Sequence, residues 1–408
     1  MRICSAAAVI TALCYSAASP LSNLSIQYPF GLPLYPSSSA TLNMGGAGAG
    51  VINEHNILLS NPANLGAIKK IAFSSLLSFD FLRITDGSHH SNHVAAAPRE
   101  LSFAFPLGIA GTIAFAVEKE TDATIKYQCE SALDADPAST FYGKLSYHRA
   151  GGVTGWRAGW GRNIGKWAYA GFGYERLYFE QNGTKIIQLI QFPANTTRDS
   201  TRISFRGHGL HLGIMVPVDK LVIGLSGRYV LKTDLSYSRG QYRDIGTAIL
   251  AETDTTDKAR IHMPPSATIG LSYEFSTRWL GAADMGIVAW NRYSSGGVLP
   301  ASDINYAMSF GAGVRFIAAP ELLAPAYWET IHYRAGIRIS QLPRNDASEI
   351  ALSLGAGLPL KGGGLLDLVI SGGRRTDRDF TDYAENFAQF AIGVNGGRKW
   401  IRTATDGY

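Results

Sequence analysis

Apolar and polar residues alternate with a period of two along most of the chain after residue 71. The segment 267–275 (ATIGLSYEF) places Ala, Ile, Leu, Tyr and Phe on one face and Thr, Gly, Ser and Glu on the other. The segment 330–340 (TIHYRAGIRIS) alternates in the same way. Because successive side chains of a strand point to opposite faces, this period predicts two-faced β-strands. The sequence offers no convincing amphipathic helix longer than about three turns.

The pattern predicts fourteen strands, whose connections are alternately short and long, with one exception at 318–328. The expected strands are 71–84, 99–106, 110–128, 141–162, 167–190, 202–216, 220–238, 264–275, 278–293, 306–317, 329–340, 349–360, 365–376 and 385–396. The long connections include 85–98, 191–201 and 239–263. An even number of antiparallel strands with short turns at one end is typical of an all-β, transmembrane antiparallel β-barrel. In lipid, only closure of such a sheet pairs every backbone polar group.

A soluble β-sandwich or propeller would also explain the alternation. It accounts less well for the alternating loop lengths and for a charged fraction of 17%, where about 25% is usual in soluble proteins. The tryptophans lie near strand ends, as the aromatic girdles of a membrane barrel would, although ordinary core packing could also use some of them. They are Trp156, Trp160, Trp167, Trp279, Trp290, Trp328 and Trp400.

The N-terminus has the features of a secretory signal peptide. Arg2 precedes a short apolar run, and small residues favour cleavage after Ala18. A membrane anchor is the alternative, but the run is shorter than the roughly 20 residues of a spanning helix. Leu13 before Cys14 is a poor fit to a lipoprotein signal. Removal of the signal leaves one cysteine, Cys129, so no internal disulfide is expected.

The segment between the signal and the first strand is rich in glycine and alanine. Residues 45–50 (GGAGAG) carry no large side chain, so their backbone must approach another group closely or turn tightly. Pro62 biases Asn61 away from the helical region, and the Asn61 amide can hold neighbouring backbone groups. We expect a hatch inside the barrel; a flexible leader is the alternative. The hatch residues are Gly45, Gly46, Gly48, Gly50, Asn61, Pro62 and Ala63.

These motifs resemble those of the outer-membrane long-chain fatty-acid transporter (FadL-type) superfamily. The stretch MGGAGAGV…SNPANLG resembles its N-terminal plug signature, 263–293 is similar to its proline-led strand pair, and LGAGLPLKGGGLLDLVISGGRRTD and ENFAQFAIGVNGGRKW resemble closing strands of relatives. The resemblance spans most of 42–400. It implies a fourteen-stranded barrel with a hatch, passive uptake of hydrophobic molecules, and sideways exit at an interrupted strand. The adjacent Gly151 and Gly152 are one candidate for that interruption.

The chain departs from this superfamily in two respects: it is short, and its closing segment is more similar to relatives without an assigned substrate. The expected organisation is a signal peptide (1–18), a hatch (19–70), a barrel (71–400) and a tail (401–408).

Several basic residues alternate with apolar ones on the predicted strands. A charge facing lipid near the midplane costs about 2–4 kcal/mol, so these side chains are expected to line the lumen. They are Arg206, Arg228, Arg315, Arg334 and Arg338. They could pair with lumen carboxylates such as Glu274 and Asp367 or with the plug, or they could form a basic path for an amphiphile with an anionic head.

Other candidate chemistry is weak. The run GGAGAG lacks the preceding strand and the register of a nucleotide-binding loop. His89, His90 and His93 could bind a metal, but a polar extracellular loop is the favoured interpretation. The remaining histidines are scattered, and Cys129 has the features of an incidental thiol. We therefore expect no catalysis, cofactor, metal or nucleic-acid binding.

The hypothesis is an outer-membrane channel of a Gram-negative-type bacterium, for passive uptake of hydrophobic or amphipathic molecules such as long-chain fatty acids. Its expected partners are that substrate, outer-membrane lipid and, during insertion, the barrel assembly machinery; a monomer is expected. The alternative is a non-transporting barrel that acts as a docking or shuttle component for secreted proteins. A transporter needs an apolar pocket continuous with a gap in the wall, whereas a docking barrel needs a filled lumen and an exposed rim.

Overall fold

The structure is a computed structural model. It describes residues 30–34, 38–54, 56–86, 89–132, 142–189, 195–245, 249–299, 302, 304–320, 325–344, 347–360, 363–377 and 383–398. The predicted signal peptide, the tail 401–408 and Trp400 lie outside the described residues.

The described chain is almost entirely β-strand. Its strands are β1 (Leu32–Pro33), β2 (Ile71–Asp86), β3 (His89–Pro106), β4 (Thr112–Lys119), β5 (Thr121–Asp122), β6 (Ile125–Ala132), β7 (Tyr142–Ile164), β8 (Ala168–Leu189), β9 (Asn195–Val218), β10 (Leu221–Val230), β11 (Thr233–Ile245), β12 (Ile249–Ile261), β13 (Ser266–Glu274), β14 (Trp279–Val288), β15 (Ala307–Phe316), β16 (His332–Gln341), β17 (Ala347–Leu360), β18 (Gly364–Asp377) and β19 (Tyr383–Arg398). The short helices are α2 (Ser39–Leu42), η2 (Pro62–Ala67), η3 (Gly108–Ala110), η4 (Trp290–Arg292) and η5 (Tyr327–Thr330).

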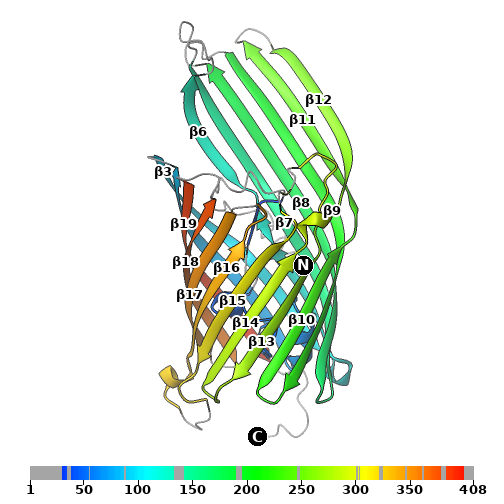
Figure 1. The fold of residues 1–408 in the computed structure, drawn as a ribbon, viewed down its shortest axis with the longest axis vertical. Helices are drawn as coiled ribbons and strands as arrows, with labels where there is room; N and C mark the ends of the chain where they lie inside the picture. Colours follow the sequence, from blue (N-terminus) through cyan, green and yellow to red (C-terminus); the bar gives the residue numbers. More distant parts are fainter. Residues whose placement is uncertain are drawn as a thin grey trace, which may run out of the picture.

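The strands close into one antiparallel barrel (Figure 1), in which β19 pairs with β2. Three wall strands are each divided in two. The two parts β4 and β6 both pair with β7, β10 and β11 both pair with β9, and β12 continues into β13. Counting each divided strand once, the seventeen segments in the barrel form fourteen wall strands, as predicted.

Side chains in the wall alternate between the lumen and the outside. On β8, Glu175 and Phe179 are buried, whereas Phe172 and Tyr174 are exposed. The exposed apolar residues form the lipid-facing surface of a transmembrane barrel. Five tryptophans are exposed, as girdle residues would be: Trp156, Trp160, Trp167, Trp279 and Trp328. Trp290 differs, because it packs against buried aromatic rings at the mouth.

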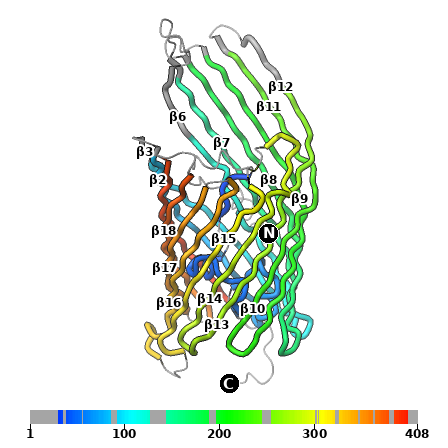
Figure 2. The backbone as a smooth tube through the Cα atoms, viewed as in Figure 1, coloured from blue at the N-terminus to red at the C-terminus, as the bar shows by residue number. Residues whose placement is uncertain are grey.

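The upper part of the wall is taller on one side than the sequence predicted. Strands β6 to β9, β11 and β12 continue beyond the mouth as a curved sheet, here called the extension (Figures 1 and 2). The expected long loops at 85–98, 191–201 and 239–263 are therefore wrong: β3 begins at His89, and β9, β11 and β12 occupy most of the other two. The segments 191–201 and 239–263 are largely polar because they belong to the extension, so apolar alternation could not reveal them.

The other end of the barrel carries the short turns. Both β2 and β19 reach this end, so the barrel begins and finishes on one side. The described parts of the exceptional connection, 318–320 and 325–326, also lie at this end, and the second part leads into η5. Among the described residues, no helix has the length and apolarity needed to cross a membrane. Short turns are periplasmic in outer-membrane barrels, so the extension is expected to face outside.

Candidate functional site in the lumen and at the mouth

The segment before the barrel lies inside the lumen and touches the wall with its backbone. Gly45 has a positive φ of 65°, and a Cβ there would collide with the backbone of Ile337. A Cβ on Gly50 would lie 2.7 Å from the Gly270 oxygen. The backbone N–H groups of Gly48 and Ala49 each donate to the Asp284 carboxylate at 2.8 Å. The glycine run therefore sits where two backbones meet, and we refer to residues 38–67 as the hatch.

The wall is matched to the hatch by glycines of its own. A Cβ at any of several inward positions would collide with hatch atoms: Gly171, Gly213, Gly224, Gly270, Gly311, Gly313, Gly336, Gly355 and Gly393. These glycines lie on β8, β9, β10, β13, β15, β16, β17 and β19. On the remaining side, Ala72, Ala104 and Ala114 pack against Ile57 and Leu65 of the hatch. The hatch thus contacts the wall around the whole lumen.

Asn61 fixes the shape of the second half of the hatch. Its side-chain oxygen accepts from the Ala63 N–H at 3.2 Å and caps η2, and its amide donates to the Ala49 oxygen at 2.7 Å. Pro62 occupies the first helical position, where its missing N–H removes no hydrogen bond. The Asn64 amide donates to the Val51 oxygen at 2.8 Å. The Asn-Pro-Ala motif therefore joins the two halves of the hatch.

Ion pairs fill the lumen beside the hatch. Arg157 contacts Glu118, Glu120 (2.7 Å) and Glu175 (3.4 Å). Arg228 contacts Glu120 (2.8 Å) and Glu175 (2.7 Å), and His211 lies 2.8 Å from Glu175. The network joins β4, β7, β8, β9 and β10 across the inside of the barrel. The sequence analysis missed Arg157 and Glu175, although both alternate with exposed residues on their strands.

A second group of ion pairs lies on the opposite wall. Arg334 donates to Asp367 at 2.6 Å, and Asp367 also accepts from Ser39 of the hatch at 2.7 Å. Arg338 and Arg375 both contact Glu349, at 2.5 and 2.7 Å. These pairs tie β16 to β17 and β18, and Asp367 anchors the start of the hatch.

The predicted basic residues divide between the two faces of the wall. Arg228, Arg334 and Arg338 point inward and are paired as described above. Arg315 lies opposite Arg334 on β15, and its buried Nε has no partner among the described residues. Arg206 was expected to line the lumen, and this prediction is wrong. Its side chain is exposed between the buried Phe205 and Gly207, on the outer face of β9. It lies above the apolar band, where an outward charge costs only about 0–1 kcal/mol.

The wall is interrupted in its third strand. Between β4 and β6 the chain leaves the barrel ladder at β5, which pairs with β1 of the N-terminal segment. The candidate residues Gly151 and Gly152 lie in β7, which is continuous, so the interruption was assigned one strand too far along the chain. They face it directly: the Ala123 N–H donates to the Gly151 oxygen at 2.9 Å, and a Cβ on Gly152 would collide with Thr121.

The interruption also splits the wall above it. The β3–β4 ladder ends at the pair Glu100 and Glu118, and the rest of β3 pairs only with β2. Among the described strands, β6 pairs only with β7. Within the described ranges, no ladder joins the upper part of β3 to β6.

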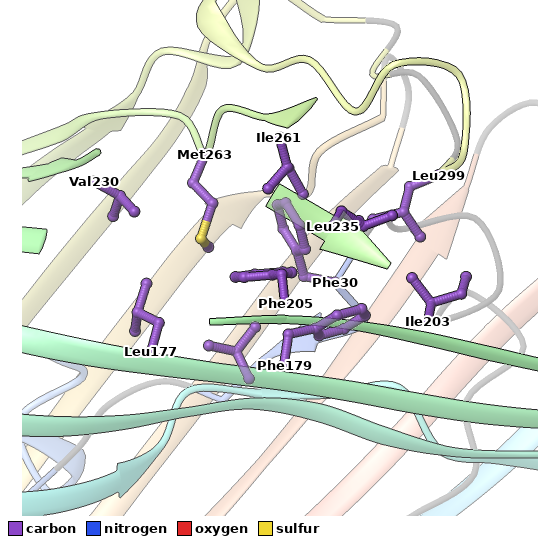
Figure 3. Close-up of a cluster of buried hydrophobic side chains, with 11 residues drawn as sticks. Phe30, Leu177, Phe179, Ile203, Phe205, Val230, Leu235, Ile261, Met263 and Leu299 are labelled. Atoms are coloured by element: carbon purple, nitrogen blue, oxygen red, sulfur yellow. The ribbon is translucent and has the colours of Figure 1, made fainter. Parts of the chain in front are cut away.

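An aromatic cluster closes the mouth beside this split (Figure 3). Phe30 lies edge-on to Phe179 and Phe205, with ring centroids 5.9 Å away in each case, and to Tyr293 at 5.5 Å. It also stacks on Trp290 at 6.3 Å. The Phe30 backbone oxygen accepts from the Thr121 hydroxyl at 2.5 Å, so the interrupted strand holds this segment in place. Phe30 therefore occupies an apolar site at the top of the lumen.

Comparison with solved structures places this fold among known barrels. A Pseudomonas aeruginosa FadL homologue superposes with a TM-score of 0.64 at 12% identity, over 90% of this chain and 99% of that one. The Pseudomonas putida toluene transporter TodX gives 0.60 at 17% identity over 90% and 98%. The CymD monoaromatic hydrocarbon channel gives 0.57 at 16% identity over 90% and 98%. No curated protein matches the sequence.

A closed antiparallel barrel of fourteen wall strands is the fold that this chain shares with these structures. Within this class, the BamG family model matches residues 2–404. The chain belongs to the BamG family.

Proposed function

We propose that this barrel is a docking component of the outer membrane that works with the barrel assembly machinery. The observation that carries the proposal is that the hatch contacts the wall around the whole lumen, while two strand edges of the extension have no pairing strand among the described residues. A filled lumen and an exposed rim are what a docking barrel requires. The name of the BamG family points to the same machinery. The proposal assigns no catalytic role.

The free edges are the first surface that supports docking. In the part of the chain that the structure describes, β12 pairs with β11 on one side and with no strand on the other, and residues 254–258 along it are exposed. Strand β6 forms the other edge. The unpaired N–H and C=O groups of such an edge can accept a further strand from a partner. The exposed charges Asp254, Asp257 and Lys258 protect β12 from indiscriminate pairing and would select the partner.

A groove on the lipid-facing wall is the second surface. It has a volume of about 930 Å³ and runs across β13 to β17. Gly281, Ala283 and Ala312 form its floor, and Leu271 and Leu354 stand on either side. Small residues permit close approach of another chain within a membrane. The wall therefore offers a partner an apolar contact below the polar extension.

The test uses a photo-crosslinking residue placed at Thr256 on the β12 edge, in cells that express the full chain. The matched control is Arg202, which is exposed on β9 in the middle of the same sheet. We expect Thr256 to crosslink to the central barrel of the assembly machinery and Arg202 not to do so. Equal crosslinking at both positions, or migration of the chain alone on native gels with no crosslink at Thr256, contradicts the proposal.

A second candidate function is uptake of hydrophobic molecules such as long-chain fatty acids. The specific observation in its favour is the apolar site of Phe30, which lies directly beside the interrupted strand. Displacement of the segment 30–34 would connect this site with the split between the upper part of β3 and β6. The FadL homologue, TodX and CymD share the fold, and the last two are described as channels or transporters of small hydrocarbons.

Phe30→Ala separates the two functions. If the barrel takes up hydrophobic compounds past Phe30, the variant should admit toluene or oleate into liposomes several times faster than the parent. Val298→Ala, a half-buried neighbour of the same cluster, is the control for general loosening. Uptake at the background rate in both parent and Phe30→Ala would exclude the channel and leave the docking proposal intact. The predicted monomeric state is a further proposal that the same native gels test.

A further inference from the structure

Two outward arginines flank an asparagine at the upper edge of the wall. Arg374 on β18 lies opposite Asn386 on β19, and Asn386 lies opposite Arg83 on β2. All three side chains are exposed. Their inward neighbours Leu82, Ile84 and Glu385 are buried, so alternation along each strand directs the three side chains away from the lumen.

No partner of these three side chains is found among the residues that the structure describes. Among the described residues, neither arginine forms an ion pair and none of the three side chains forms a hydrogen bond. The outward residues next to them along the strands are Thr85, Ala384 and Thr376 above and Phe81, Ala388 and Gly372 below. The row therefore carries two positive charges with no adjacent outward carboxylate among the described positions. Every inward arginine of β16 and β18, in contrast, is paired with a carboxylate.

The row lies where the apolar surface ends. Below it on the outer face of β2 and β18 are Phe81 and Ile370, which are 48% and 65% exposed. Above it, β2 and β18 end within a few residues. Because the short turns are at the opposite end, this boundary corresponds to the outer leaflet. Charged side chains at this depth face lipid head groups rather than acyl chains.

Two small residues lie directly beneath the row, and their position is here called the notch. Gly372 and Ala388 are opposite each other and have little or no side chain, whereas the larger Phe81 and Leu352 stand on their two sides. Leu352 is 61% exposed on the same outer face. The row and notch together give polar donors above and an apolar recess below.

We propose that Arg83, Asn386 and Arg374 bind a phosphate group of an outer-leaflet glycolipid, whose acyl-bearing sugar sits in the notch of Gly372 and Ala388. Two strand spacings separate the arginines, about 10 Å, and their long side chains can reach one group between them. Guanidinium groups bind phosphate oxygens with two parallel hydrogen bonds, and the asparagine amide adds a donor in the middle. The placement of both charges, without carboxylates, on the lipid side of the wall follows from this role.

The test measures binding of lipid A to the purified full chain in a nonionic detergent by native mass spectrometry. Three probes are compared: lipid A with its phosphates, the same lipid after enzymatic dephosphorylation, and inorganic phosphate. We expect the parent to bind the phosphorylated lipid about tenfold or more tightly than the dephosphorylated one, as charged hydrogen bonds would give. Inorganic phosphate at millimolar concentration should not displace the lipid.

Two variants and a control assign the effect to this site. Arg83→Gln with Arg374→Gln should abolish the preference for phosphate, and Ala388→Leu should weaken lipid binding by filling the notch without a change of charge. Lys220→Gln with Arg278→Gln removes two exposed charges at the short-turn end and should leave binding unchanged. Heat-dependent gel mobility verifies that each variant is folded.

Three results would overturn the proposal. One is equal binding of both lipids by the parent, and another is full retention of the phosphate preference in Arg83→Gln with Arg374→Gln. The third is displacement of the lipid by inorganic phosphate at comparable concentration, which would assign the row to a soluble anion instead of a membrane lipid.

Discussion

A Cβ atom on Gly213 would collide with the side-chain oxygen of Asn61, so the wall at this position is shaped for the hatch. Gly213→Val should therefore displace the Asn-Pro-Ala motif while leaving the lipid-facing surface unchanged. We expect the variant to fold as a barrel and to be several times more permeable to small solutes in liposomes. Swelling or dye-release assays on reconstituted protein measure this directly.

Gly227→Val is the matched control for the hatch prediction. Gly227 lies on the neighbouring strand β10, and a Cβ there would have only one neighbour, at 3.9 Å. Its permeability should equal that of the parent. Equal permeability of all three proteins would show that contact between Asn61 and the wall does not seal the lumen.

Substitutions of Arg334 and Asp367 are expected to show a large coupling energy, because both side chains of this ion pair are buried, with 4% and 0% exposure. Removal of one partner leaves an uncompensated charge, which typically costs about 3–5 kcal/mol. Arg334→Met and Asp367→Leu should each lower the free energy of unfolding by about that amount, and the double variant should lose less than the sum. Denaturant unfolding of the refolded barrel supplies all four values of the cycle.

Lys69 and Glu54 provide the comparison for this cycle. They are 3.1 Å apart but are 75% and 53% exposed. Exposed pairs contribute about 0–1 kcal/mol, so Lys69→Met and Glu54→Leu should combine additively and cost little. If the coupling energy of Arg334 and Asp367 is as small as that of Lys69 and Glu54, solvent reaches the lumen pair.

The number of strands and the position of the hatch glycines could be predicted from the sequence because each follows from a local rule. A lipid-facing strand must alternate, and a backbone that meets a wall must lack side chains. The extension could not be predicted in this way. The segment 253–260 (TDTTDKAR) shows no apolar alternation, because β12 belongs to the extension beyond the lipid-facing wall.

The candidate site was predicted only in part, for a related reason. Arg228 and Arg334 lie in ion pairs on the inner face of the wall, where a charge on a membrane strand is expected because a charge on the lipid face is costly. The same rule led to the wrong prediction for Arg206. The rule holds only for residues inside the hydrocarbon layer, and the depth of a residue in the membrane cannot be determined from the sequence. The contacts of Phe30 with Phe179 and Phe205 could not be predicted either. Phe30 lies 149 and 175 positions before these two residues, and only the closed barrel brings the three rings together.

The orientation of the barrel can be tested by cysteine labelling in a Cys129→Ser background. Thr256 on the extension and Ser276 in a short turn are both exposed. A membrane-impermeant maleimide should label Thr256→Cys on whole cells, whereas Ser276→Cys should react only after lysis. The reverse result would place the extension in the periplasm and would also remove the basis for an outer-leaflet lipid at Arg83.

Asp284 is expected to hold the glycine run in place. Its carboxylate accepts from the N–H groups of Gly48 and Ala49, both at 2.8 Å, while its other oxygen is buried without a partner among the described residues. Hydrogen bonds to a charged group contribute about 1.5–3 kcal/mol, and each 1.4 kcal/mol is a factor of ten. Asp284→Asn should therefore speed amide hydrogen exchange at Gly48 and Ala49 about tenfold or more, with unchanged exchange in the strands.

Asp254→Asn on the exposed β12 edge serves as the control and should leave the hatch amides as slow as in the parent. If Asp284→Asn leaves these two amides equally slow, the hatch is held by backbone packing against the wall glycines rather than by this carboxylate.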